Sequence, residues 1–232
     1  MKFNHRNDQS EEIIAIRIKV RKLIGEAKYK IAYKYLLLEQ KKFPKSYYIA
    51  SMLATLNAED AFILNDRDKK IAFNIAANKL KSLLKYSRSC SPDLRNRNIN
   101  EYYWFSEQHL KQYKFGNSRV EAGDPKGHYS AGVGSTNYAY KLALSGKLNE
   151  SLRWADKAIH HWEFYFKLVT KKYHDPWYWY SLALAISQKF KGSQKAMIKS
   201  AKLSGKDIHS NPAFKKLNKM IDKIKEKQNE KK

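Results

Sequence analysis

Apolar residues recur along the chain at the three- and four-residue spacing of amphipathic helices, and polar turns, glycines or prolines separate the runs. The first two runs are followed by Gly25 and Pro44, which favour helix ends. The pattern predicts helices over residues 11–24, 28–42, 46–63, 68–86, 93–115, 137–144, 148–173, 177–188, 192–203 and 213–227. Because the chain has only 9 glycines and 5 prolines for its turns, we predict an all-α protein.

Residues 137–159 contain the clearest pair of helices. Tyr138, Ala139 and Leu142 fall on one face before the turn at 145–147. The periodicity continues after the turn at Leu148, Ser151, Leu152, Ala155, Ala158 and Ile159. A helical hairpin cannot bury both of its faces alone, so we expect similar hairpins on either side of this one.

This stretch resembles the tetratricopeptide repeat (TPR). The residues that match the pattern of the repeat are Tyr138, Ala139, Leu142, Gly146, Leu148, Ser151, Ala155 and Ala158, with Ala155 smaller than usual. A second copy lies 42 residues further on, at Trp177, Tyr180, Ser181, Leu184, Phe190, Ser193, Met197 and Ser200. A third candidate comprises Ile16, Val20, Leu23, Tyr29, Ala32, Leu36 and Pro44, and departs from the pattern at Lys19 and Glu39. The resemblance implies an array of antiparallel helical hairpins, a TPR-like α-solenoid, with residues 213–227 as its capping helix.

The predicted organisation is a single helical domain over residues 11–227, with a disordered lead at 1–10 and a frayed basic tail at 228–232. Five glycines and Pro125 fall within residues 116–134. We therefore predict a glycine-rich loop over 115–134, and long loops inside helical arrays are often functional.

The chain carries 46 Lys and Arg against 22 Asp and Glu, a formal net charge of +24. Such an excess suggests an anionic partner, although lysines spread over helix surfaces also serve simply to solvate them. No run reaches the roughly 18 uncharged apolar residues of a membrane span, and the polar first residues predict no signal peptide. The single cysteine, Cys90, excludes an internal disulfide and favours a cytoplasmic location.

Repeat proteins of the TPR type hold peptides or partner proteins against the first helix of each hairpin. The resemblance therefore implies a non-catalytic scaffold or adaptor, without a cofactor, that binds a partner protein or peptide, and an acidic partner would match the charge. The candidate contacts are Asn137, Tyr140, Lys141, Tyr178 and Ser181. The first alternative is a nucleic-acid- or ribosome-associated helical protein.

The second alternative is a ligand-binding protein or enzyme that uses the predicted loop. Its candidate contacts are Arg119, Lys126, His128 and Tyr129. The loop lacks the glycine spacing of a phosphate-binding P-loop. His160 and His161 are adjacent on a predicted helix and point about 100° apart, so we predict no metal site.

Overall fold

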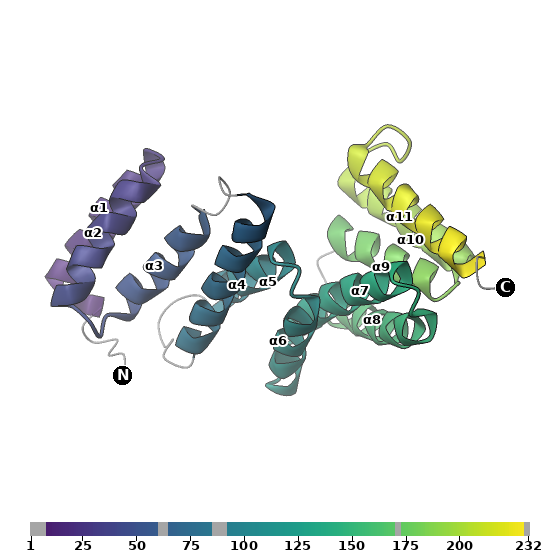
Figure 1. Cartoon of the computed structure of the whole chain (residues 1–232), viewed down its shortest axis with the longest axis horizontal. Helices are drawn as coiled ribbons and strands as arrows, with labels where there is room; N and C mark the ends of the chain where they lie inside the picture. The colour runs from purple at the N-terminus through teal and green to yellow at the C-terminus, as the bar shows by residue number, and fades with distance from the viewer. Residues whose placement is uncertain (1–7, 60–64, 85–91, 170–172, 230–232) are drawn as a thin grey trace. The chain divides into compact units, whose positions relative to one another are not determined.

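The computed structural model of the chain describes residues 8–59, 65–84, 92–169 and 173–229 (Figure 1). Every regular element in these ranges is a helix, which confirms the all-α prediction. The sequence predicts one domain over residues 11–227, whereas contacts divide the chain into two compact units, Met1–Gln108 and His109–Lys232. Cys90 lies outside the described residues.

Unit 1 contains the first five helices. They are α1 (Glu11–Gly25), α2 (Tyr29–Lys42), α3 (Tyr47–Glu59), α4 (Asp66–Leu83) and α5 (Pro92–Phe105). Unit 2 contains α6 (His109–Glu121), α7 (Gly127–Leu144), α8 (Leu148–Leu168), α9 (His174–Ile186), α10 (Phe190–Ser204) and α11 (Pro212–Asn229).

The start of unit 1 is tied to α3 by a buried carboxylate. Asp8 accepts hydrogen bonds from the Ser46 hydroxyl at 2.5 Å and from the Tyr48 backbone N–H at 3.0 Å. Ser46 in turn accepts from the Ile49 N–H at 3.2 Å and thereby caps α3. Most of the predicted disordered lead lies outside the described residues, but Asp8 is buried within it.

The hairpins α1–α2, α7–α8 and α9–α10 have turns of the same geometry. Each turn places a single residue in the left-handed region, at φ 55° for Ala27, 78° for Gly146 and 60° for Gln188. The N–H of the following lysine donates to the carbonyl of a leucine five residues earlier, at 2.8–3.0 Å. This is a Schellman-type helix end, and the next helix begins directly after the lysine.

Counted from this turn residue, the same positions are buried in all three hairpins. The residue seven before the turn is fully buried: Val20, Ala139 and Ser181. The residues five and nine after it are also buried: Ala32 and Leu36, Ser151 and Ala155, Ser193 and Met197. In the two hairpins of unit 2 a serine hydroxyl bridges the helices at this level, Ser151 to the Ala139 carbonyl and Ser181 to the Ser193 carbonyl, both at 2.8 Å. The three hairpins therefore repeat one packing register.

Gln188→Gly is expected to stabilise unit 2 by about 1 kcal/mol, because a side chain costs roughly that much in the left-handed region. Thermal unfolding followed by circular dichroism should show a midpoint roughly 3 °C higher. Gln188→Ala keeps the strained φ and should show no such gain. Equal midpoints for the glycine and alanine variants would contradict the strain at this turn.

Two predicted elements are wrong. The helix predicted over 93–115 is interrupted, because α5 ends at Phe105 in a Schellman-type turn with Glu107 at φ 55°. The loop predicted over 115–134 is mostly helix, because α6 continues to Glu121 and α7 begins at Gly127. Only residues 122–126 connect the two helices.

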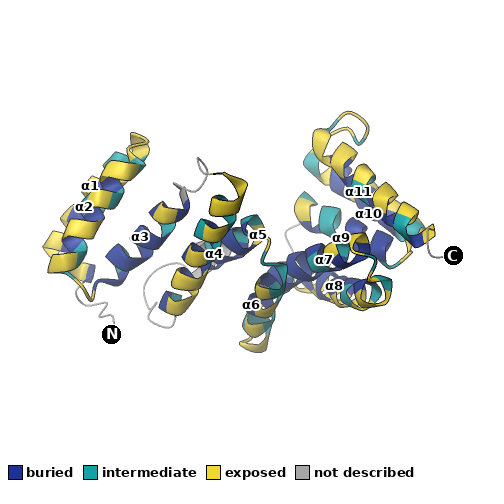
Figure 2. Cartoon of the chain, viewed as in Figure 1, coloured by how far each residue is buried: buried dark blue, intermediate teal, exposed yellow. Residues whose placement is uncertain are grey.

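Four of the five glycines in this region, Gly116, Gly127, Gly132 and Gly134, serve close helix packing, and only Gly123, at φ 82°, serves the chain reversal. A Cβ atom added at Gly116 would overlap the backbone of Ala131, and one at Gly134 would lie 2.5 Å from the Tyr113 backbone nitrogen. A Cβ at Gly132 would lie 2.7 Å from the indole of Trp162. The absence of side chains therefore lets α7 pack directly against α6 and against the aromatic face of α8, and most of its residues are buried (Figure 2).

The predicted frayed tail also needs a correction. The helix α11 runs through Asn229, and the buried Gln228 amide donates a hydrogen bond to the Ile186 carbonyl at 3.0 Å. Gln228 therefore anchors the end of α11 to the end of α9, and the last three residues lie outside the described ranges.

Candidate functional site

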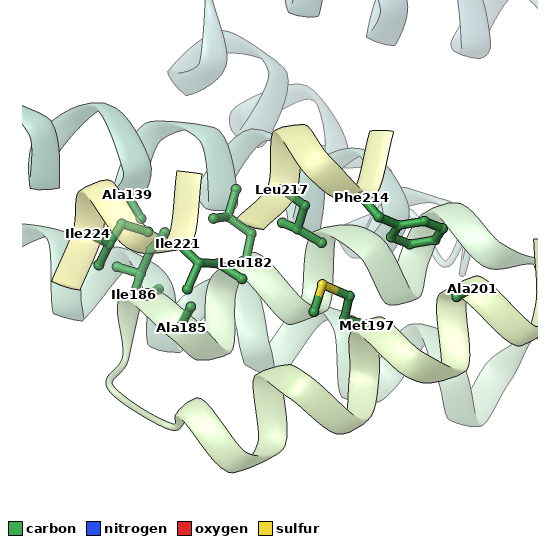
Figure 3. Packing of buried hydrophobic residues seen from close by; sticks show 11 residues of the cluster. Ala139, Leu182, Ala185, Ile186, Met197, Ala201, Phe214, Leu217, Ile221 and Ile224 are labelled. Carbon is green, nitrogen blue, oxygen red and sulfur yellow. The ribbon is translucent and has the colours of Figure 1, made fainter. Parts of the chain in front are cut away.

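The first-helix face of unit 2, where the sequence predicts partner contacts, is covered by α11. This helix contacts both α9 and α7. Its apolar side chains point into the cluster that α7, α9 and α10 form (Figure 3). The residues of α11 that enter this cluster are Phe214, Leu217, Ile221 and Ile224. Their partners in it include Ala139, Leu182, Ala185, Ile186, Met197 and Ala201.

Tyr140 and Tyr178 lie against this cluster and are half-buried. The ring of Tyr178 is 6.4 Å from that of Phe214, centroid to centroid. Burial, with a smaller contribution from Tyr140, raises the pKa of Tyr178 to about 12. Burial also raises the pKa of Tyr140. Both predicted contacts are therefore near each other, as expected of one surface, but α11 occupies that surface.

The other three predicted contacts differ in accessibility. Asn137 is buried and donates from its side-chain amide to the Val133 carbonyl of its own helix at 2.9 Å. Ser181 is fully buried, and its hydroxyl lies 2.8 Å from the Ser193 carbonyl and 3.0 Å from the Ser193 hydroxyl. Only Lys141 is exposed. Asn137 and Ser181 thus serve packing inside unit 2.

The residues predicted as loop contacts lie at the junction of α6 and α7, where most of them contact other residues of the same unit. Both Nε and Nη2 of Arg119 donate to one carboxylate oxygen of Asp124, at 2.9 and 2.6 Å. The other oxygen accepts from the Lys126 backbone N–H at 3.0 Å. Tyr129 packs edge-on against Trp162, with centroids 5.7 Å apart. Among the four predicted contacts, Lys126 alone is exposed.

The fourth predicted loop contact, His128, pairs with His161 across α7 and α8. Their Nδ1 atoms are 3.0 Å apart and buried, so one neutral ring donates and the other accepts. Phe164 stacks on His128 at 5.4 Å, and Tyr113 of α6 lies edge-on to His161 at 5.7 Å. In the described ranges no three His, Cys, Asp or Glu side chains gather closely enough to hold a metal ion.

Burial and the neighbouring charges keep both histidines neutral. Burial lowers the pKa of His161 to about 4, with smaller contributions from His128, His160 and Lys157. Burial also lowers the pKa of His128, with a contribution from His160. No residue spacing in the sequence indicates this pair, because the partners lie 33 residues apart on different helices.

Acidification is expected to destabilise unit 2 through this pair. Below pH 6.5 the unfolded chain binds a proton at His161 that the folded protein excludes until about pH 4, so stability falls as the pH decreases across this window. The expected loss between pH 7.5 and pH 5 is about 2 kcal/mol, measurable by urea unfolding at the two pH values. His161→Gln should reduce the difference. An unchanged difference in the free energy of unfolding between the two pH values in His161→Gln would contradict the attribution of this pH dependence to His161.

A second surface, which is not among the predicted contacts, lies on α1. Ile14, Arg17, Ile18 and Arg21 follow the i, i+3, i+4, i+7 spacing of one helix face, and we call this set the α1 patch. It lies beside the buried residues Ile13, Ile16 and Val20 around the helix, and Arg17 at its edge is half-buried. The signal was present in the sequence, because the apolar residues of α1 are spread too widely around the helix to share one buried face.

Comparison with protein-family models, curated proteins and solved structures finds no match to this chain. Within the described ranges, every helix is too short or too polar to cross a bilayer.

Proposed function

We propose that this chain is a non-catalytic scaffold, built of TPR-like helical hairpins, that binds a partner protein or peptide. The observation that carries the proposal is the register shared by three hairpins, with one turn geometry and the same buried positions before and after it. Repetition of one supersecondary unit with small residues at the helix crossings is typical of helical-repeat proteins. Such arrays act mainly as extended binding surfaces, although a fold alone does not fix a function.

The packing of α11 supports this proposal from a second direction. In unit 2, α7 and α9 bind the amphipathic helix α11 through four large apolar side chains of α11. Recognition of a helix in an apolar groove is a common mode of peptide binding. The chain thus contains an internal example of the contact that we propose for a partner.

The side chains with chemical reactivity support a non-catalytic role. The buried histidine pair is packed between aromatic rings, and Arg119 is engaged by Asp124. These histidine and arginine contacts stabilise the packing between helices. The single cysteine favours a cytoplasmic location for the scaffold.

The test is capture of partners by the tagged full chain from lysate of the cells that produce it, with and without nuclease. We expect one or a few proteins to co-purify in stoichiometric amounts after nuclease treatment, and purified partner to bind with a measurable dissociation constant. Binding only in the presence of nucleic acid would overturn the proposal.

A second candidate function is binding to nucleic acid or the ribosome, and the charge of α10 and α11 favours it. The exposed face of α10 carries Lys191, Lys195, Lys199 and Lys202, and α10 contains no acidic residue. The outer face of α11 adds Lys215, Lys216, Lys219 and Lys223. For this function we expect binding to a fluorescein-labelled RNA to decrease steeply between 50 and 200 mM salt, because each phosphate contact releases a counterion (roughly tenfold or more overall).

A further inference from the structure

The α1 patch combines two exposed isoleucines with two arginines on one face. Ile14 is 46% exposed and Ile18 is 66% exposed, one helical turn apart. Isolated exposed apolar residues are ordinary on protein surfaces, but here they alternate with cations along a single stripe. The acidic residues of α1, Glu11 and Glu12, are confined to its first turn.

In unit 2 the positions equivalent to Arg17, Ile18 and Arg21 are covered, whereas the position equivalent to Ile14, Asp175, is exposed. Counted from the turn residue, Arg17, Ile18 and Arg21 stand ten, nine and six residues before Ala27. The equivalent residues before Gln188 are Tyr178, Trp179 and Leu182, all of which belong to the cluster that α11 closes. In the shared register, this face of a hairpin's first helix is therefore one on which a helix can lie.

The two arginines of the α1 patch favour a negatively charged binding partner. Arg21 is exposed, whereas Arg17 is half-buried over the Tyr48 ring at 4.8 Å, with its Nε atom buried. Neither arginine forms an ion pair with a described residue. A second copy of this chain is a poor occupant, because the chain carries +24 and α11, its own amphipathic helix, is rich in lysine. Carboxylates beside apolar side chains would match both components of the patch.

We propose that the α1 patch binds an acidic amphipathic helix of a partner protein. The apolar side of that helix lies on Ile14 and Ile18, and its carboxylates pair with Arg17 and Arg21. This inference rests on the proposed scaffold function and names the chemistry of the partner.

The probe is a fluorescein-labelled model helix of about 18 residues, long enough to form several turns, with leucines on one face and glutamates on the other. Fluorescence anisotropy with the full chain should show saturable binding that weakens with added salt. The double substitution Ile18→Asp and Arg21→Glu should weaken binding at least tenfold. A peptide with lysines in place of the glutamates should not bind.

The matched control is Ile31→Asp with Lys34→Glu on α2. It makes the same change in charge at the same three-residue spacing, at an isoleucine that is 55% exposed and an exposed lysine. We expect it to leave the dissociation constant within about twofold, a difference of only a few tenths of a kcal/mol. Thermal unfolding of both variants should match the wild-type protein, since all four positions lie on the surface.

Four results would overturn the inference. Equal loss of binding in both double variants would mean general charge attraction. Absence of saturable peptide binding would show that the patch does not bind an acidic helix. Binding of anionic lipid vesicles or RNA with the same dependence on Ile18 and Arg21 would assign the patch to another class of ligand. If nuclease-resistant capture of a partner survives Ile18→Asp with Arg21→Glu, the scaffold function stands and the α1 patch is not its binding site.

Discussion

Gly116→Ala is expected to destabilise unit 2 by about 3 kcal/mol or more, one of the largest effects of any single methyl group in this chain. The added Cβ would overlap the backbone nitrogen of Ala131 and lie 2.8 Å from the Gly127 carbonyl oxygen. Backbone atoms cannot rotate away as a side chain can, so α6 and α7 would have to separate. Urea unfolding followed by far-UV circular dichroism measures the loss.

Gly192→Ala provides the matched control. Gly192 is also a helical glycine of unit 2, but its nearest neighbour would be the Leu184 side chain at 3.5 Å, an ordinary contact distance. Alanine favours a helix over glycine by roughly 0.5–1 kcal/mol, so this variant should be slightly more stable than the wild-type protein. Similar stabilities for the two alanine variants would show that α6 and α7 are not as close as the structure places them.

Trp162→Ala is expected to cost 3–5 kcal/mol, a range typical of large aromatic residues in cores. The indole is fully buried, lies on Gly132, and donates its Nε1–H to the Thr136 hydroxyl at 3.1 Å. Its removal leaves both a cavity and an altered hydrogen-bond network at the centre of the α7–α8 hairpin.

The comparison for this variant is Trp104→Ala, at a tryptophan that is 37% exposed. We expect it to lose under about 1 kcal/mol, as surface substitutions generally do. Calorimetry would measure both variants. A loss at Trp162 as small as that at Trp104 would be inconsistent with its position in the core.

The spacing of apolar residues predicted most helices, because the apolar residues of each helix lie on the face that is buried. The hairpin over 137–159 has its turn and its buried small residues where the pattern placed them. At 177–200 the small residues are buried, but the turn at 187–189 comes two residues before the predicted break at 189–191. Periodicity could not reveal the end of α5, because Glu107 adopts a left-handed conformation that its residue type does not signal. Gln188 also adopts a left-handed conformation that its residue type does not indicate. The turn between α9 and α10 could therefore be predicted only from the apolar pattern on either side of it.

The loop prediction for residues 115–134 was wrong for a different reason. Glycine favours a loop when neighbouring helices are unknown, but it also permits close contact when a second helix passes within reach. The distinction depends on tertiary contacts of Gly116, Gly127 and Gly134 that no local window contains. For the same reason the sequence suggested Tyr140 and Tyr178 as open contacts, since their cover comes from α11, more than 30 residues later in the chain.

The position of α11 in the chain affects how unit 2 folds during synthesis. Translation proceeds from the N-terminus, and domains tend to fold as soon as their residues emerge. Residues 212–229 are the last part of unit 2 to leave the ribosome, so Leu182, Ile186 and their neighbours remain solvent-accessible until then. Unit 1 can form on the nascent chain, whereas unit 2 would pass through a period in which chaperones find an apolar surface to bind.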